Sequence, residues 1–203
     1  MFITFEGIDG CGKTTQIRYL TDFLEQNGFE VVATREPGGT DFSEQLRDIL
    51  LHSKHKISPI SELFLFNAAR AHLIETLILP AIKNNKVVIS DRFYDSTLAY
   101  QGYGRGLNKE DIEKCNEIIK QMGAIPNVTF LLDISTEDAL QRREGEKKDR
   151  IESSDINFFE KVRNGYLKIA EQEPNRVKVI NASQEKHITS EKIKKIIQEI
   201  MKI

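Results

Sequence analysis

Three glycines and a lysine lie between a short apolar run and the first helical pattern of this 203-residue chain. The apolar run is FITF (2–5), and the stretch FEGIDGCGKTTQ has the spacing Gly-x-x-x-x-Gly-Lys-Thr from Gly7 to Thr14. Glycines let successive backbone N–H groups point at one centre, and the following helix directs the positive end of its dipole there. The motif therefore predicts a strand, a loop that binds nucleotide phosphates, and a helix.

Separate roles are expected within this loop. Lys13 is expected to bridge the outer phosphates of ATP, and the Thr14 hydroxyl to bind Mg²⁺. The residues expected to line the ATP phosphates are Gly7, Ile8, Asp9, Gly10, Cys11, Gly12, Lys13, Thr14 and Thr15. Cys11 has two interpretations: a side chain that only fills the loop, or a reactive thiol whose pKa the helix start lowers.

Short apolar runs alternate with longer segments of helical period. This alternation predicts an α/β fold in which a five-stranded parallel sheet is covered by helices on both faces. Strands are expected at 2–5, 30–34, 86–90, 128–133 and 177–180, and helices from the glycine loop to Gly28 and at 43–51, 59–83, 109–122, 155–173 and 189–202. The length fits a single domain over residues 1–203.

Composition limits the partners and the location. The 29 Lys and Arg against 31 Asp and Glu give no basic surplus, which argues against nucleic acid as a partner. We find no signal peptide and no run of about 18 uncharged apolar residues, so no membrane partner is expected. Two cysteines without a paired spacing fit a reduced compartment, and the protein is expected to be cytoplasmic.

A second group of charged residues follows other strands. Asp91 and Arg92 come directly after the run KVVIS, where parallel sheets place their ligands. An aspartate there can hold Mg²⁺ through water, and an arginine can fork onto a phosphate. Arg35 ends the second strand, Arg47 follows it, and Arg70 lies on the apolar helix. Together with the loop lysine, these arginines predict two phosphorylated ligands and phosphoryl transfer between them.

Other nucleotide-binding proteins were weighed against this interpretation. The stretch from Asn108 to Asp111 matches a guanine-reading pattern, but no buried strand precedes it, and Asn108 is better explained as a helix cap. A nucleic-acid-dependent ATPase would need a basic track. A binding module without catalysis would not need the second arginine site. Another nucleoside monophosphate or deoxynucleoside kinase stays open.

Five stretches resemble thymidylate kinases, and the match runs over essentially the whole chain. They are FEGIDGCGKTTQ, TREPGGT, ELFLFNAARAHL, DRFYDSTLAYQGYGRG and KKDRIESSDINFFEKVRNGYLKIA. The resemblance implies the three-layer fold of P-loop kinases. It also implies phosphorylation of dTMP to dTDP with ATP, Mg²⁺ as cofactor, and a homodimer.

The resemblance also implies contacts to the acceptor. Arg92 would hold the 5′-phosphate of dTMP, with Arg35 or Arg47 nearby. Phe66 would stack on thymine, and Arg70 would hydrogen-bond an exocyclic oxygen. The remaining expected contacts to dTMP are Glu36, Pro37, Ser96 and Gln101.

Further contacts follow from the same resemblance. Thr97 would read the pyrimidine edge, and Tyr100 would lie under the sugar, where a 2′-hydroxyl would clash. Asp9 would accept a hydrogen bond from the 3′-hydroxyl. The residues implied to border adenine are Asn181, Ala182, Ser183 and Gln184.

The charged segment 142–153 is expected to be an exposed, mobile lid. Some thymidylate kinases carry an arginine in the phosphate loop, where this chain has Gly10. The resemblance therefore implies the subgroup in which the lid supplies the catalytic arginine. Arg142, Arg143 and Arg150 are the candidates, and the choice between Arg143 and Arg150 stays open. With Lys13, Arg92 and Asp9, this arginine completes the expected catalytic set.

Overall fold

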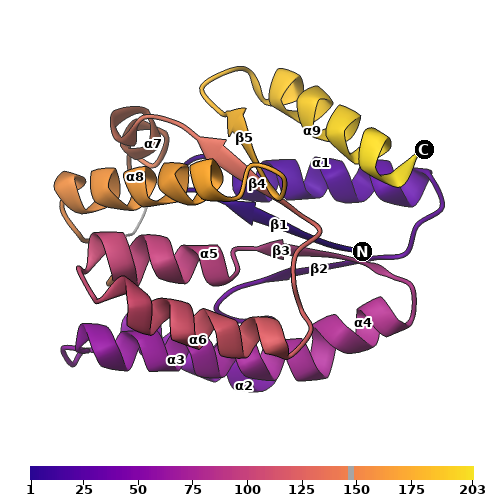
Figure 1. Ribbon diagram of the computed structural model, residues 1–203. Coiled ribbons are helices and arrows are strands. Elements are labelled where there is room, and N and C mark those ends of the chain that lie inside the picture. The colour runs from indigo at the N-terminus through magenta and orange to yellow at the C-terminus, as the bar shows by residue number, and fades with distance from the viewer. Residues whose placement is uncertain (146–148) are drawn as a thin grey trace.

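A five-stranded parallel sheet forms the centre of the molecule (Figure 1). The computed structural model describes residues 1–145 and 149–203. The strands are β1 (Phe2–Glu6), β2 (Val31–Arg35), β3 (Val87–Asp91), β4 (Val128–Asp133) and β5 (Val177–Asn181). They lie in the order β2-β3-β1-β4-β5, and every adjacent pair is parallel. The predicted sheet is confirmed, with strand ends at most one residue from their expected positions.

Helices and helical turns connect the strands. In chain order they are α1 (Lys13–Gln26), α2 (Asp41–His52), α3 (Pro59–Leu73), the π-helical turn η1 (Ile74–Ile78), α4 (Leu79–Lys83), α5 (Tyr94–Thr97), the π-helical turn η2 (Leu98–Gly104), α6 (Lys109–Gln121), α7 (Thr136–Arg142), α8 (Ile156–Gln172) and α9 (Lys186–Met201). Each of the six predicted helices corresponds to helical structure.

The helices form a layer on each face of the sheet. α1 and α9 pack against each other on one face, in the core that holds Ile3 and Phe5 of β1. α3, α4 and α6 lie on the other face, in the core that holds Phe2 of β1 and Val88 of β3. Alternate residues of β1 thus enter two cores, because successive side chains of a strand point to opposite faces. The predicted three-layer α/β fold is confirmed.

The helical path from Pro59 to Lys83 is continuous through α3, η1 and α4. Ser58 caps its start by accepting a hydrogen bond from Ser61 N at 3.2 Å. Pro80 lacks an N–H and lies in the first turn of α4, two residues after the π-helical turn ends. By length and composition alone this helix could cross a membrane, but core helices of globular folds pass the same test. Here it contributes buried residues to the sheet's core.

Two helical stretches are not predicted by the sequence. One runs from Tyr94 to Gly104 through α5 and η2, and its π-helical part does not follow the 3.6-residue period. The other is α7, whose seven residues are too few to show a period. Both stretches lie at the end of the sheet where the strands finish, on the left of Figure 1.

The guanine-reading pattern at 108–111 is a helix start. The Asn108 side chain accepts a hydrogen bond from Glu110 N at 2.9 Å and caps α6. The prediction that Asn108 is a cap is therefore confirmed.

Candidate active site

A cavity of about 520 Å³ opens where β1, β2 and β3 end. The start of α1, the ends of β2 and β3, and the end of α7 all contribute to its walls. Its lining includes Gly10, Gly12, Lys13, Thr14, Thr15, Arg35, Arg47, Asp91, Arg92, Arg142 and Arg143. We call this the donor cavity. Six of these side chains are arginine or lysine, so its walls are suited to several phosphate groups.

The phosphate loop closes around its own lysine. Lys13 Nζ donates to the backbone oxygens of Gly7 at 3.1 Å and Ile8 at 3.3 Å. Gly12 precedes α1 with φ +99° and has no side chain to cap the first N–H groups of the helix. These N–H groups are available for an anion at the positive end of the helix dipole.

Cys11 lies inside this loop. Its side chain is buried, and burial raises the pKa of the thiol despite the nearby charges of Lys13 and Arg92. The interpretation of Cys11 as a thiol with a lowered pKa is therefore wrong. The helix start does not lower the pKa because burial of the thiolate outweighs the helix dipole and the cations.

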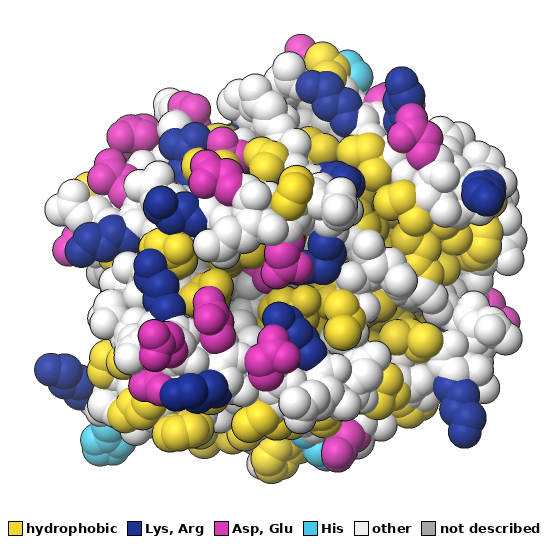
Figure 2. Space-filling view, in the orientation of Figure 1, with side chains coloured by type: hydrophobic (Ala, Val, Ile, Leu, Met, Phe, Trp, Pro, Cys, Tyr) yellow, Lys and Arg dark blue, Asp and Glu magenta, His cyan; other side chains and the backbone are white. Residues whose placement is uncertain are grey.

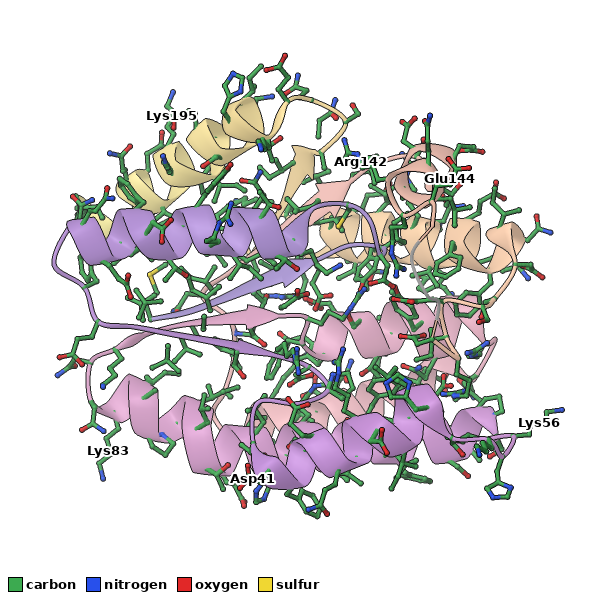
Figure 3. The ribbon with its side chains drawn as sticks, turned by 180° about the vertical axis from the view of Figure 1, so that it is seen from behind. Asp41, Lys56, Lys83, Arg142, Glu144 and Lys195 are labelled. Carbon is green, nitrogen blue, oxygen red and sulfur yellow. The ribbon has the colours of Figure 1, made fainter. Side chains whose placement is uncertain are left out.

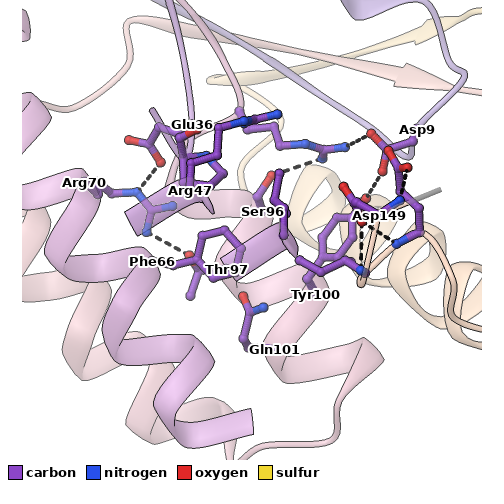
Figure 4. A pocket seen from close by; sticks show the side chains of 15 residues that line it. Asp9, Glu36, Arg47, Phe66, Arg70, Ser96, Thr97, Tyr100, Gln101 and Asp149 are labelled. Carbon is purple, nitrogen blue, oxygen red and sulfur yellow. Dashed lines mark hydrogen bonds and ion pairs between the residues drawn. The ribbon is translucent and has the colours of Figure 1, made fainter. Parts of the chain in front are cut away.

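A second cavity lies next to the first, and Figure 4 shows the side chains that line it. We call it the acceptor cavity. Its lining includes Asp9, Glu36, Pro37, Arg47, Phe66, Arg70, Arg92, Ser96, Thr97, Tyr100 and Gln101. These are all the residues predicted to contact dTMP except Arg35. The two cavities share Asp9, Glu36, Arg47, Arg92 and Glu152.

Arg92 stands between the two cavities. Its Nη2 donates to Asp9 Oδ1 at 2.7 Å, and its guanidinium lies 5.0 Å from the centre of the Tyr100 ring. Burial disfavours the ionised carboxylate of Asp9, but Arg92 and Lys13 outweigh it and hold the pKa of Asp9 well below its usual range. Arg92 has φ +73°, a conformation that costs about 1–3 kcal/mol for a residue with a side chain. In this backbone conformation the Arg92 side chain lines both cavities.

Arg70 is buried, with 1% of its surface exposed, so it is not the surface charge that its helix position also allowed. Its Nε donates to Glu36 Oε2 at 2.6 Å, and its Nη1 donates to Thr97 Oγ1 at 2.8 Å. Burial raises the pKa of Glu36 to about 7, against the opposing charge of Arg70. The other oxygen of Glu36, Oε1, has no hydrogen-bond partner within the described chain.

The two arginines that follow β2 occupy different positions. Arg47 lines both cavities and donates from Nη1 to the Pro37 backbone oxygen at 2.7 Å. Arg35 lines the donor cavity but not the acceptor cavity, and its Nη2 is 3.2 Å from Glu44 Oε2. Of these two, Arg47 is therefore the one placed to reach an acceptor phosphate.

The three arginines of segment 142–153 point to different places. Arg142 and Arg143 line the donor cavity, and Arg142 donates to the backbone oxygen of Ala182 at 2.9 Å. Arg143 Nη2 lies 2.9 Å from Glu152 Oε2. Arg150 instead donates from Nη2 to Glu62 Oε2 at 2.6 Å, away from the donor cavity. Figure 3 shows Arg142 in the view from behind.

The expectation that segment 142–153 is exposed throughout is wrong. Ile151 is buried, and Arg150 N donates to the Leu51 backbone oxygen at 3.1 Å. The apolar Ile151 joins the core next to α2, which holds the end of the segment against the fold. Residues 146–148 of the expected lid lie outside the described residues, and the mobility of the segment stays a prediction.

The residues expected around adenine follow β5. Ala182 is connected to the donor cavity by its hydrogen bond from Arg142. Ser183 donates from N and Oγ to Asn181 Oδ1 at 2.9 and 2.6 Å, which forms a local turn. Gln184 accepts a hydrogen bond from Lys192 Nζ at 2.7 Å. Arg142, which lines the donor cavity, is therefore the residue that joins the cavity to this turn.

The family model for thymidylate kinase matches residues 5–193, and it spans both cavities. The chain belongs to the thymidylate kinase family. Members are ATP-dependent phosphotransferases, so the expected enzyme class is confirmed.

Individual thymidylate kinases are similar over most of their length. The thymidylate kinase of Thermoanaerobacter sp. (strain X514) is 48% identical over 184 residues, which are 91% of this chain and 90% of that protein. The thymidylate kinase of Caldanaerobacter subterraneus subsp. tengcongensis is 44% identical over 201 residues, covering 99% and 96%. The crystal structure of the Ehrlichia chaffeensis thymidylate kinase superposes with a TM-score of 0.81 at 36% identity, covering 98% of both chains.

Four further polar residues of this thymidylate kinase site were not predicted. Asp149 and Glu152 line the acceptor cavity from the charged segment, where sequence pattern gave no direction for the side chains. Glu6 and Tyr166 lie behind Arg92 in a buried hydrogen-bonded group. Tyr166 falls on the apolar stripe of α8 and therefore resembles a core residue in sequence. The signal for Glu6 is a charged residue ending an otherwise apolar strand.

The donor set of the site fits Mg²⁺. The Thr14 hydroxyl and the Asp91 carboxylate line the same cavity and supply oxygen, which Mg²⁺ prefers. Among residues 1–145 and 149–203, no group of three His, Cys, Asp or Glu could hold a metal alone.

Proposed function

We propose that the protein transfers the γ-phosphoryl group of ATP to a phosphate oxygen of dTMP, giving dTDP and ADP. The observation that carries this proposal is the pair of adjacent cavities that share Asp9 and Arg92. The nucleophile is already an anion, so the reaction needs no general base. Catalysis then depends on alignment of the two nucleotides and on stabilisation of negative charge.

Acceptor binding is assigned to the side chains of the acceptor cavity. Arg92 and Arg47 hold the 5′-phosphate, and Phe66 stacks on thymine. Arg70 and Thr97, joined by a 2.8 Å hydrogen bond, read the polar edge of the base. Tyr100 and Asp9 border the sugar, and the Tyr100 hydroxyl donates to Asp9 Oδ2 at 3.3 Å. The remaining contacts in this assignment are Glu36, Pro37, Ser96 and Gln101.

Donor binding is assigned to the loop from Gly7 to Thr15. Lys13 leaves its backbone partners in the loop and binds the outer phosphates. Adenine lies beside the turn from Asn181 to Gln184. Thr14 and Asp91 would hold Mg²⁺, which when bound neutralises charge on the phosphates.

We assign the catalytic lid arginine to Arg143. A side chain at Gly10 would overlap the backbone oxygen of Ala139 in α7, and φ there is +88°. The phosphate loop therefore has no room for an arginine at that position. Arg143 lines the donor cavity, whereas Arg150 is paired with Glu62. An arginine supplied to a transferring phosphoryl group accelerates turnover by about 10³ to 10⁵.

A homodimer is part of the proposal. α2 and α3 pack against each other and expose Phe42, Ile49, Ile60 and Phe64. Hydrophobic side chains gather along the lower edge of Figure 2, where these helices lie. Sedimentation of the wild type should give the mass of a dimer, and Phe64→Asp should shift the mass toward a monomer. A cytoplasmic location is consistent with the free thiols of Cys11 and Cys115.

The substrate is tested by incubating the protein with ATP, Mg²⁺ and, separately, each deoxynucleoside and each nucleoside monophosphate. We expect a diphosphate product with dTMP at the highest kcat/KM. A reaction mixture without an acceptor measures ATP hydrolysis. Preference for another monophosphate, or for a deoxynucleoside, would overturn the roles of Arg70 and Thr97. Hydrolysis of ATP as the main activity would indicate an ATPase.

A further inference from the structure

Glu6 is a fully buried carboxyl group at the end of β1, where it lines neither cavity. Its Oε1 accepts a hydrogen bond from Phe93 N at 2.7 Å. Its Oε2 accepts from Ser96 Oγ at 2.6 Å and from Tyr166 OH at 2.9 Å. A buried carboxyl is costly unless its partners satisfy it, and here three donors from β3–α5 and α8 converge on it.

The two hydroxyl groups connect Glu6 to Arg92. Arg92 Nη1 donates to Tyr166 OH at 3.1 Å and approaches Ser96 Oγ at 3.4 Å. Each hydroxyl has one hydrogen and two lone pairs. The two hydroxyl oxygens are also 2.7 Å apart, so their two hydrogens serve three contacts. When both hydrogens point to Glu6 Oε2, the lone pairs of the two oxygens face each other and the guanidinium. The ionised carboxylate thus places two acceptors, with a negative charge behind them, against Arg92.

We propose that Glu6 is a positioning residue for the acceptor site: its carboxylate orients the Ser96 and Tyr166 hydroxyls so that they hold the Arg92 guanidinium toward the acceptor phosphate. This inference rests on the proposed role of Arg92. Glu6 itself touches no substrate. Its effect is on binding of the acceptor, because the donor phosphates are held by the loop and Lys13.

Protonation of Glu6 would disturb this arrangement. A protonated carboxyl donates to one hydroxyl, whose hydrogen can then turn to the other hydroxyl 2.7 Å away, so the negative charge behind the Arg92 contacts is lost. Burial and the nearby Asp95 raise the pKa of Glu6 to about 7. The titratable and charged groups that face it from the neighbouring elements are Glu36, Arg92, Tyr94, Asp95 and Tyr166. Asp95 is itself held by Arg176 at 2.7 and 2.8 Å.

The test compares Glu6→Gln with wild type at several pH values. The amide keeps the size of the side chain but carries no negative charge. Its NH₂ either faces the Phe93 N–H or donates to the two hydroxyls, whose hydrogens then lose their acceptor. We expect KM for dTMP to rise about 10-fold or more at pH 8 and KM for ATP to change less than about 2-fold. In wild type, KM for dTMP should fall as pH rises through about 7, beyond the change due to the phosphate of dTMP, which ionises near pH 6. Glu6→Gln should keep only the phosphate's change.

Thr4→Val is the matched control. Thr4 lies two residues earlier on β1, and its buried hydroxyl is 2.7 Å from Thr129 Oγ1, with no contact to Arg92. It should lower thermal stability and leave KM for dTMP unchanged. If Glu6→Gln raises both KM values equally, or keeps the wild-type pH profile, the positioning role is wrong.

Tyr166→Phe keeps the inference testable should Glu6→Gln not fold. It removes one of the two hydroxyls and should also raise KM for dTMP selectively. An unchanged KM for dTMP in this variant would overturn the inference. Failure of wild type to phosphorylate dTMP would overturn the proposed function. A wild type with normal activity beside an unaffected variant would overturn only the positioning role of Glu6.

Discussion

At the scale of single residues, the site contains two cations that lie close together and are expected to serve different nucleotides. Lys13 Nζ and Arg92 Nη2 lie 3.9 and 2.7 Å from the same oxygen of Asp9. Asp9 therefore links the donor loop to the acceptor cavity. Removing either cation should impair one nucleotide more than the other.

Lys13→Ala and Arg92→Ala should each lower kcat by at least about 10²-fold, because each removes charge stabilisation of the phosphoryl group. Arg92→Ala should also raise KM for dTMP. Steady-state kinetics with each substrate varied in turn measures both effects, and circular dichroism checks that each variant is folded. Near-normal turnover in either variant would contradict its assigned role.

Arg143→Ala and Arg150→Ala should differ in kind. Loss of Arg143 should lower kcat by about 10³-fold, the low end of the range for a supplied arginine. Loss of Arg150 removes one cation that pairs with the buried Glu62, which also binds Gln101 of the acceptor cavity. It should therefore lower thermal stability and raise KM for dTMP while kcat falls less. Reversal of the two kcat effects would show that Arg150 is the catalytic arginine.

Most residues of the site could be predicted from the sequence because motifs fix their place on the chain. Tyr100 and Gln101 lie in such a motif, and both line the acceptor cavity as expected. Glu6 and Asp149 escaped prediction because their importance depends on partners from other elements. The buried partners of Glu6 come from segments about 90 and 160 residues later in the chain.

At the scale of elements, the phosphate loop and α7 are in close contact. Gly10 lies against the backbone of Ala139, so α7 occupies the space that a loop side chain would need. Because α7 leads into segment 142–153, the contact that excludes a loop arginine also sets where Arg142 and Arg143 enter the donor cavity.

Gly10→Arg should therefore fail to restore activity to Arg143→Ala. The new side chain would force α7 to move, and its positive φ adds strain. We expect a fall in melting temperature and no gain in kcat for the double variant. Gly145→Ala, at a positive φ with open space around it, controls for backbone strain alone. Recovery of kcat in the double variant would contradict the steric argument.

The elements were predictable where a regular period was long enough. The strands and the helix capped by Asn108 were placed correctly because caps and apolar runs are local signals. The stretch from Tyr94 to Gly104 was missed because π-helical turns have another period. That stretch packs extensively on α8, so tertiary contact supports it where local preference does not.

At the scale of the whole molecule, two buried carboxyl groups make stability depend on pH in the same direction. The pKa values of Glu6 and Glu36 are each raised from 4.5 to about 7, mainly by burial. The folded state therefore binds more protons than the unfolded state between these values. Stability from these groups is complete below about pH 4.5 and is lost as pH rises to about 7.

The free energy of unfolding should accordingly fall between pH 5 and pH 7, and Glu6→Gln should reduce this fall. Carboxylates with lowered pKa values, such as Asp9, do not change stability in this window. Their contribution to the free energy of unfolding is lost only as pH falls below the ordinary pKa of 3.8. Urea unfolding at pH 5, 6, 7 and 8 measures the effect. A flat or rising profile between pH 5 and 7 would contradict it.

At position 6, thermal stability and catalysis favour different side chains. Burial favours an uncharged group there, whereas the hydroxyls that hold Arg92 require an anion. A mutational library selected only for survival at high temperature should therefore enrich uncharged residues at position 6, and the recovered enzymes should be slow at low dTMP. Selection for growth on limiting thymidylate should restore the glutamate.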